Sequence, residues 1–343
     1  MILTMKKGYS EQELLQVVWQ INEVGLETHV SRGSERTVVG VIGDTRKLSK
    51  DLLARLPQIE SVSPVLKPFK LASRDFHPDD TIVSVNGVKI GGKDFTVIAG
   101  PCSVESEQQL REACQGVKEA GAKILRGSAY KPRSSPYSFQ GLGEEGLKIL
   151  RKVANEFDMV VETEVMDTRE VKKAAKYVDM LRIGARNMYN TDLLKEVGKL
   201  RKPVILKRGM SSTIQEFLLA AEYLLNEGNN EVILCERGIR TFETETRFTL
   251  DIGCIPVVQQ LSHLPIIVDP SHAAGKRYIV PALSKAALAA GADGMIIEVH
   301  PNPDEALSDG PQQLNIEQFK MLMKEMHKFG NAMDKGLAKI AVQ

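Results

Sequence analysis

The sequence lacks the features that mark membrane, secreted and nucleic-acid-binding proteins. No apolar run approaches the roughly 20 residues that cross a bilayer, and the opening MILTMKK reaches its lysines too early for a secretion signal. The net charge of +1 offers no excess of positive charge for nucleic acid. We therefore expect a cytoplasmic protein that binds neither membranes nor nucleic acid.

Cysteine is scarce and irregularly spaced. The chain has 4 cysteines, and their spacing matches neither a disulfide framework nor a zinc knuckle. We expect reduced thiols. What the chain has in quantity is hydrophobic residues, 43% of 343, which is enough for a large core with a smaller companion domain.

Residues 1–67 predict a small α+β domain of their own. MILTMKK reads as a strand, and Ser10 with Glu13 forms a capping box for a helix with Leu14, Val18 and Ile21 on one face. Two more strands, a second helix over 45–56 and a last strand follow. The order βαββαβ is typical of a ferredoxin-like or ACT-like regulatory domain, although such a module can also serve only assembly.

The remaining chain predicts a (β/α)8 TIM barrel. Residues 68–93 read as a linker followed by a β-hairpin about Asn86-Gly87, a dipeptide favoured in tight hairpin turns. Over 94–343 eight short apolar runs alternate with helical patterns, as a barrel requires. An open doubly wound sheet is the competing fold, but it usually has fewer strands and a glycine-rich dinucleotide turn, which this sequence lacks.

Each predicted barrel strand ends in a polar group, and in a barrel these ends all lie at the mouth that carries active sites. Charged residues often end strands without any function, which explains two or three of them but hardly all eight. The groups are Cys102, Arg126, Glu164, Arg186, Lys207 with Arg208, Arg237, Asp269 with His272, and Glu298.

Four residues form a candidate metal site. Residues 264–310 read as strand, helix, strand, so His272, Glu298 and the following Asp309 converge at one edge, with Cys102 as a fourth ligand. Sulfur, imidazole and carboxylate together suit Mn²⁺, Fe²⁺, Co²⁺ or Zn²⁺. His300 is the rival ligand, because it would share the face of Glu298 if the strand continued.

A second set of residues is cationic and suits polyanions. Arginine forks bind phosphate and carboxylate bidentately, and lysine adds a point charge. The number of cations suffices for two phosphorylated substrates, or for one that also bears a carboxylate. The set comprises Arg126, Lys131, Arg133, Arg186, Lys207, Arg208 and Arg237.

These motifs resemble 3-deoxy-D-arabino-heptulosonate-7-phosphate (DAHP) synthases of type I that carry an ACT-like regulatory domain. The resemblance covers the whole barrel in order and implies metal-dependent, aldol-type condensation of phosphoenolpyruvate with erythrose 4-phosphate and water, the first step of the shikimate pathway to chorismate and the aromatic amino acids. The matching segments are GPCSVE (100–105), LRGSAYKPRSSPYSFQGLG (125–143), IGARN (183–187), LKRG (206–209), CERGIRTFE (235–243), VDPSH (268–272) and EVHPNPDEALSDG (298–310).

The resemblance also implies roles for individual residues. It places the metal, with Mn²⁺ as the first choice, on Cys102, His272, Glu298 and Asp309, which makes His300 the weaker candidate. It places the erythrose-phosphate clamp on Arg133 and Ser134, where Thr is commoner than Ser. The phosphoenolpyruvate site maps to Arg126, Lys131, Arg186, Lys207 and Arg237.

The proposed chemistry leaves some assignments open. Lys131 is the candidate acid for the aldehyde oxygen, with a water on the metal as its rival, and either Glu164 or Asp269 positions the attacking water. An alternative activity is 3-deoxy-D-manno-octulosonate-8-phosphate synthase, which takes arabinose 5-phosphate. That family tends to carry Asn where this chain has Pro132-Arg133, and it lacks the ferredoxin-like module. A regulatory subunit with a relic barrel would not keep all these ligands and cations.

Regulation is predicted through the N-terminal domain. His29 and Ser31 alternate along one strand and so share a face, where they could contact a tyrosine or phenylalanine effector between subunits. The competing interpretation is that they are ordinary polar strand residues. A homotetramer is expected from the resemblance alone.

Overall fold

A computed structural model describes residues 1–33, 36–43, 48, 53–63, 67–131, 135–333 and 335–337. The chain forms two compact units, and residues 260–263 join the first. Unit 1 comprises Met1–Asp80 with Gln260–His263, and unit 2 comprises Thr81–Gln259 with Leu264–Gln343. No helix in the described ranges combines the length and apolar character that crossing a membrane requires.

Unit 1 is built on a four-stranded antiparallel sheet in the order β2-β3-β1-β4. The predicted capping box is present: Ser10 accepts from the Glu13 amide, and Glu13 accepts in return. Helix α1 buries Leu14, Val17 and Ile21. The second predicted helix lies largely outside the described residues. The elements are β1 (Ile2–Met5), α1 (Glu11–Glu23), β2 (Glu27–Arg32), β3 (Thr37–Ile42) and β4 (Ile59–Ser63).

The segment predicted as a linker packs into unit 1 rather than running free. The Phe76 ring lies over Gly40 of β3, where an added Cβ would come within 1.3 Å of its Cε2 atom. Phe76 joins Ile2 and Val38 in a small apolar cluster on that sheet face. In the same segment, the amide of Arg74 donates to the Leu261 carbonyl. Residues 260–263 therefore contact this segment within unit 1.

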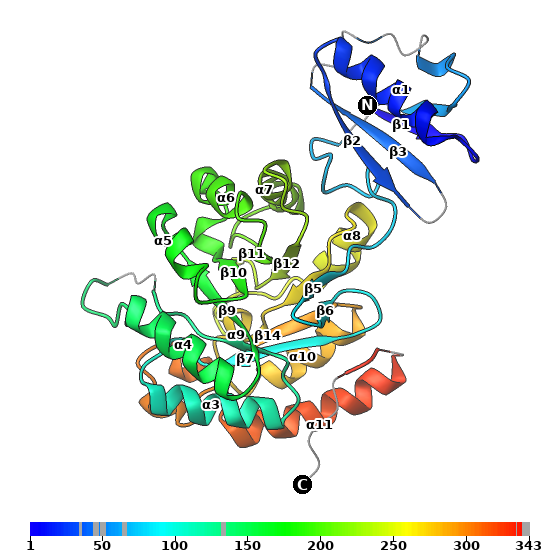
Figure 1. Cartoon of the computed structure of the whole chain (residues 1–343). Helices are drawn as coiled ribbons and strands as arrows, with labels where there is room; N and C mark the ends of the chain where they lie inside the picture. Colours follow the sequence, from blue (N-terminus) through cyan, green and yellow to red (C-terminus); the bar gives the residue numbers. More distant parts are fainter. Residues whose placement is uncertain are drawn as a thin grey trace. The chain divides into compact units, whose positions relative to one another are not determined.

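Unit 2 is a closed parallel barrel of eight strands, which confirms the predicted fold class. Helices alternate with the strands and surround them (Figure 1). The strands are β7 (Thr96–Gly100), β8 (Ile124–Arg126), β9 (Val160–Val165), β10 (Met180–Ile183), β11 (Val204–Lys207), β12 (Val232–Glu236), β13 (Ile266–Val268) and β14 (Gly294–Glu298).

Several of the helices between these strands begin at side-chain caps. Thr213 with Glu216 forms a capping box, and Ser106 caps the helix that follows β7. The α-helices are α3 (Glu107–Glu119), α4 (Glu144–Glu156), α5 (Thr168–Ala174), α6 (Thr191–Gly198), α7 (Ile214–Asn226), α8 (Cys254–Leu261), α9 (Pro270–Ala274), α10 (Val280–Ala289) and α11 (Ile316–Ala332). Short 3-10 turns are η2 (Ala185–Asn187), η3 (Pro303–Glu305) and η4 (Gly310–Gln312).

The predicted hairpin precedes the barrel and packs against its interior. Strands β5 (Val83–Val85) and β6 (Val88–Ile90) meet at Asn86 and Gly87, whose φ values of 45° and 82° suit the tight turn. Val83, Val85 and Ile90 pack with at least one apolar side chain from each barrel strand. This layer includes Ile98, Ile124, Val160, Met180, Ile205, Ile233, Ile267 and Ile296.

Side chains alternate along each strand, so the residue two positions after each of these apolar groups also faces the interior. Those positions carry charge on most strands, and nearly all are buried. The barrel interior therefore changes from an apolar layer to an ionic layer toward the C-terminal ends of the strands. The ionic layer comprises Arg126, Glu162, Arg182, Lys207, Asp269 and Glu298.

Candidate active site and metal centre

The four predicted metal ligands come together at the C-terminal ends of the strands. Ligand atoms of Cys102, Glu298 and Asp309 all lie within 4.8 Å of one another. The Nε2 atom of His272 lies 3.5 Å from Glu298 Oε1 and 3.7 Å from Asp309 Oδ2. The sequence prediction that these four groups converge is therefore matched by the geometry.

Asp269 orients His272 toward that cluster. It caps the short helix α9, where its Oδ1 accepts from the His272 amide at 2.9 Å. Its Oδ2 lies 2.8 Å from Nδ1 of the imidazole and also pairs with Lys207. With a carboxylate oxygen beside Nδ1, Nε2 is the nitrogen that faces Glu298 and Asp309, an arrangement common for histidine ligands of metals.

The electrostatics of the cluster fit a divalent cation. Burial, followed by the charge of Glu298, raises the pKa of the Cys102 thiol to about 12. Burial alone would raise the pKa of Glu298. The charges of the neighbouring His272, Arg126 and Lys131 outweigh burial and lower this pKa to about 2. Two carboxylates, an imidazole and a thiol that lies buried among them form a donor set suited to a borderline transition ion.

His300 points elsewhere. Its Nε2 lies 3.3 Å from Glu105 Oε2, and its Nδ1 accepts from the Asn302 amide at 3.0 Å. Both ring nitrogens are thus engaged in fastening the loop that follows β14. The rival ligand assignment finds no support in this geometry.

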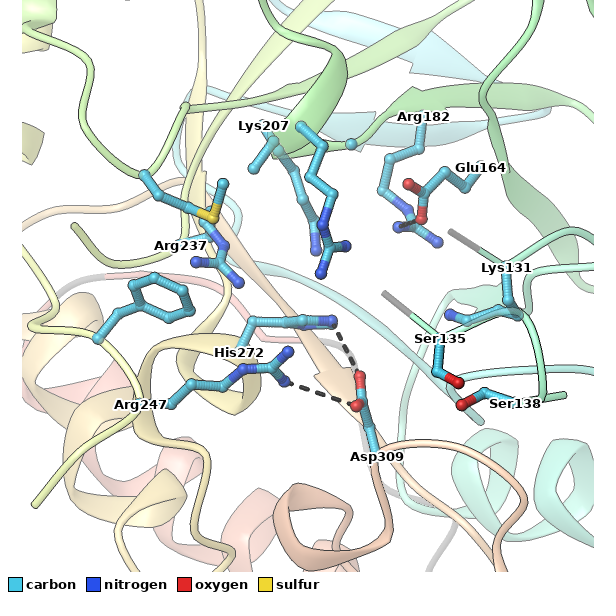
Figure 2. A pocket seen from close by; sticks show the side chains of 15 residues that line it. Lys131, Ser135, Ser138, Glu164, Arg182, Lys207, Arg237, Arg247, His272 and Asp309 are labelled. Carbon is cyan, nitrogen blue, oxygen red and sulfur yellow. Dashed lines mark hydrogen bonds and ion pairs between the residues drawn. The ribbon is translucent and has the colours of Figure 1, made fainter. Parts of the chain in front are cut away.

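Beside the cluster lies a cavity of about 260 Å³, and six of its 15 lining residues are lysine or arginine (Figure 2). Of the predicted site residues, it is lined by Lys131, Glu164, Arg186, Lys207, Arg237, His272 and Asp309. Arg126, Cys102, Asp269 and Glu298 are fully buried, each 0% exposed. Arg133 and Ser134 lie outside the described residues.

Two buried arginines at the site hold N–H donors without a hydrogen-bond partner in the described part of the chain. In Arg126 these are Nε and Nη1, while Nη2 donates to Glu298 at 3.0 Å. In Arg237 the unpaired group is Nη1, and the guanidinium stacks on Phe248 at 4.1 Å. Buried donors of this kind are costly unless a ligand satisfies them, so they indicate a site for an anion.

Lys207 and Arg208 are neighbours on the chain but point to different surroundings. Lys207 faces the interior and pairs with Asp269. Arg208 donates to Glu236 at 2.9 Å, to Asp251 at 2.8 Å and to the Ser212 carbonyl, and it does not line the cavity. Its predicted contact with substrate stays a prediction.

The structure also distinguishes Glu164 from Asp269. Asp269 has both oxygens engaged and does not line the cavity, whereas Glu164 does. Its Oε2 accepts from Arg182 Nη1 at 2.9 Å. Burial would raise the pKa of Glu164, but the charges of Arg182, Lys131 and Lys207 outweigh burial and lower it.

Sequence reasoning missed several residues of the site. Arg182 and Glu162 could have been found from the two-residue period, because each lies two positions after an apolar interior residue. Arg247 gave no such signal, because it lies in the loop between β12 and α8. It reaches the cavity, where Nη1 lies 3.5 Å from Asp309 Oδ1 and donates to Gln312 at 2.9 Å.

The predicted effector residues share a covered face of unit 1. His29 and Ser31 lie on β2, with Gly40 opposite His29. The His29 ring centroid is 4.8 Å from that of Phe76, and Ser31 is buried. The predicted alternation is present, on the face that Phe76 covers.

Comparisons with known proteins agree with this geometry. The family model for the DAHP synthetase I family matches residues 80–333, and that for the DAHP synthase ferredoxin-like domain matches residues 1–67. A phospho-2-dehydro-3-deoxyheptonate aldolase of Thermotoga maritima is 53% identical over 97% of this chain and 98% of its own. A crystal structure of a DAHP synthase from that organism gives a TM-score of 0.78 at 52% identity, covering 97% of this chain and 98% of that one. A 2-dehydro-3-deoxyphosphooctonate aldolase of Francisella tularensis is 36% identical over 68% of this chain and 92% of its own.

Proposed function

The chain belongs to the DAHP synthetase I family, and we propose that it condenses phosphoenolpyruvate with erythrose 4-phosphate and water. The products are 3-deoxy-D-arabino-heptulosonate 7-phosphate and inorganic phosphate, and the reaction opens the shikimate pathway. The observation that carries this conclusion is the four-ligand cluster beside two buried arginines with unpaired donors. That pairing suits a reaction between two anions at a metal centre.

The octonate-forming alternative has weaker support. The relative named for that reaction covers less of this chain at lower identity, whereas the heptonate relative spans both units. The match to a ferredoxin-like domain of DAHP synthases over residues 1–67 favours the heptonate product as well. No feature of the described cavity favours arabinose 5-phosphate.

We assign phosphoenolpyruvate to the inner cations. Arg126 and Arg237 offer unpaired buried donors, and Lys131, Arg186 and Lys207 complete the set at the cavity wall. A carboxylate and a phosphate together could satisfy these forks bidentately. Arg133 and Ser134 remain the proposed clamp for the phosphate of erythrose 4-phosphate, and Ser135 and Ser138 line the cavity close by in sequence.

Cys102, His272, Glu298 and Asp309 are proposed to hold the metal, with Mn²⁺ as the first choice and Fe²⁺, Co²⁺ or Zn²⁺ as alternatives. The donor set fits such an ion, because it combines a thiol, an imidazole and two carboxylates in a buried cluster. When bound, such an ion supplies Lewis acidity that polarises an aldehyde oxygen.

The chain's own residues position the reactants and move protons. The cations hold two anions together against their repulsion, so that C3 of phosphoenolpyruvate lies against the aldehyde carbon. As the C–C bond forms, Lys131 donates a proton to the aldehyde oxygen. Positive charge develops at C2, and water adds there. Loss of phosphate by C–O cleavage then leaves the ketone.

Glu164 is the proposed partner of the attacking water. Its place at the cavity wall supports this choice over Asp269, whose oxygens are already engaged by His272 and Lys207. Asp269 instead has the proposed role of orienting His272.

An assay of phosphoenolpyruvate consumption tests the proposed function. The protein is given erythrose 4-phosphate or arabinose 5-phosphate, each before and after EDTA treatment and again after Mn²⁺ is restored. We expect consumption with erythrose 4-phosphate, loss on chelation and recovery with Mn²⁺. Preference for arabinose 5-phosphate would assign the octonate reaction, and indifference to EDTA would refute the metal centre.

We also propose that residues 1–67 form a regulatory domain that binds tyrosine or phenylalanine through His29 and Ser31. The support is an aromatic site already present in unit 1, where Phe76 packs over Gly40 beside His29. Gly40→Val should displace the Phe76 ring and reduce inhibition by these amino acids, while uninhibited activity is kept. Unchanged inhibition in this variant would argue against the site. A homotetramer is proposed on family resemblance and is tested by sedimentation.

A further inference from the structure

Arg182 lies inside the barrel and joins two carboxylates of the neighbouring strand. It is 1% exposed, and each nitrogen of its guanidinium donates a hydrogen bond. Nε donates to Glu162 Oε2 at 2.9 Å, and Nη1 donates to Glu164 Oε2 at 2.9 Å. Nη2 donates to Ser128 Oγ at 3.0 Å. Three of its five N–H groups are thus engaged, which fixes the guanidinium on three sides.

The strand register places the Arg182 guanidinium beside Glu164. Arg182 of β10 is paired directly with Glu164 of β9, and β10 ends just beyond it. Gly184 follows, and an added Cβ there would lie 2.1 Å from Glu164 Oε1. The Glu164 carboxylate therefore lies between the Arg182 guanidinium and the backbone of Gly184, where a side chain on residue 184 would clash with it. Figure 2 shows both side chains at the cavity wall.

The two oxygens of Glu164 have different surroundings. Oε2 is bonded to Arg182, whereas Oε1 accepts no hydrogen bond from the residues that the structure describes. Glu162, by contrast, does not line the cavity. Of the two carboxylates that Arg182 binds, only Glu164 can meet a substrate. The charged groups that act on Glu164 are Arg182, Lys131, Lys207 and His272, and Glu162 shares Arg182 with it.

We propose that Arg182 is a positioning residue that keeps Glu164 ionised and fixed by one oxygen, so that the other oxygen receives a proton from the water that adds to C2. This inference rests on the proposed function. In the step, one O–H bond of water breaks, the water oxygen bonds to C2, and the proton passes to Glu164 Oε1. In this step Arg182 acts through Glu164 and exchanges no proton.

A purely structural role for Arg182 makes a different prediction. Such an ion cluster could serve only to satisfy two carboxylates inside the barrel, and its loss would then lower stability and activity alike at every pH. If Arg182 instead positions Glu164, the fall in activity of the variant should depend on whether Glu164 is protonated. Because Arg182 lowers the pKa of that carboxyl, removing it should let Glu164 take up a proton at higher pH.

The test is the pH profile of the Arg182→Met variant with saturating Mn²⁺. We expect kcat to fall about tenfold or more, which is part of the roughly 10²–10⁴-fold that a general base contributes, and the KM for phosphoenolpyruvate to change by no more than about threefold. We expect the acid limb of kcat to move to higher pH. A folded variant whose acid limb stays in place would overturn the proposal.

Two control variants separate charge from packing. Ser128→Ala removes the third partner of Arg182 and leaves both ion pairs, so the acid limb should not move. Glu162→Gln removes a neighbouring negative charge, so any shift should be toward lower pH, opposite to that of Arg182→Met. If the acid limb of Glu162→Gln also moved to higher pH, any disturbance of the ion cluster would produce the shift. That result would also overturn the proposal.

Arg182→Met leaves two buried carboxylates without their cation and could fail to fold. The double variant Arg182→Met/Glu162→Gln removes one of them and serves as the second test, with the same upward shift expected relative to Glu162→Gln. Failure of the proposed function is recognised separately, because the unaltered enzyme would then make no heptulosonate phosphate at any pH. Normal synthesis with an unshifted limb in the variants would refute only the role of Arg182.

Discussion

The Nζ atom of Lys131 lies 3.0 Å from the Sγ atom of Cys102 and 3.1 Å from its carbonyl oxygen. The lysine thus links the proposed metal ligands to the cavity, which it also lines. Both side chains are buried, so the ammonium group is held at one place rather than sampling solvent. This position suits a proton donor to an aldehyde oxygen that is bound beside the cluster.

Replacing the Cys102 sulfur should weaken metal binding. We expect Cys102→Ser to lower the affinity for Mn²⁺ by about a hundredfold or more, since even partners behind a ligand contribute 10- to 100-fold. Calorimetric titration of the metal-free protein measures this directly. Cys114→Ser is the matched control, because Cys114 is also buried but packs against Met159, away from the cluster. Equal affinities in the two variants would rule out the thiol as a ligand.

Arg237 should be needed for phosphoenolpyruvate and dispensable for folding. Burial lowers the pKa of its guanidinium, and its Nη1 has no hydrogen-bond partner among the described residues. We therefore expect Arg237→Gln to weaken phosphoenolpyruvate binding by about 2–4 kcal/mol, while thermal stability is kept or raised. Calorimetry and thermal unfolding check the two parts. Arg240→Gln, on the exposed part of the same loop, should change neither; an Arg237 variant that binds normally would contradict the assignment.

The barrel and the convergence of the four proposed metal ligands could be predicted from the sequence because both follow from short-range rules. Apolar runs that alternate with helices require parallel strands, and parallel strands bring their C-terminal ends together. Cys102 and Glu298 are far apart in the chain, yet they had to meet once β7 and β14 were neighbours. The N-terminal module followed equally from element order, and its sheet has the order β2-β3-β1-β4.

The cationic set was predicted less well, because strand ends alone do not say which way a side chain points. Lys207 and Arg208 are adjacent, so they cannot both face the interior, and only Lys207 does. Arg182 was passed over in favour of Arg186, although the period from Met180 places it inside. Arg247 lies in an irregular loop, where no periodicity exists to indicate its position.

Arg208 is expected to stabilise the fold rather than contact substrate. Burial raises the pKa of Glu236, and Arg208 opposes that effect from 2.9 Å. Arg208→Met should leave this carboxylate uncompensated and cost about 3–5 kcal/mol of unfolding free energy, as for other broken buried pairs. Denaturant titration measures the loss, and phosphoenolpyruvate affinity of the folded variant should be unchanged.

A matched double variant checks the cause. Arg208→Met/Glu236→Gln removes both charges and should regain part of the lost stability. If Arg208→Met instead weakens phosphoenolpyruvate binding at normal stability, the sequence-based prediction of a substrate contact is correct and the structural role is not.

His263 sits in a stacked pair of histidines within unit 1. Its ring centroid lies 4.4 Å from that of His77, and its Nε2 is 2.8 Å from the Leu71 carbonyl, to which a neutral ring can donate. Burial lowers the pKa of His263 to about 4 despite that hydrogen bond, and the charges of His77 and Arg74 add to the effect. The folded protein therefore holds this ring neutral.

Acidification should consequently destabilise the protein through His263. The unfolded chain takes up a proton near pH 6.5 and the folded chain only near pH 4, so the unfolded state binds more protons between these values. Stability is fully present above pH 6.5 and falls as pH drops toward 4, by about 2 kcal/mol at pH 5. Denaturant titrations at pH 7 and pH 5 measure the loss. His263→Gln keeps a side-chain donor for the Leu71 carbonyl but cannot titrate, so its stability should fall less between the two pH values. An equal fall in both proteins would show that other groups govern the acid limit.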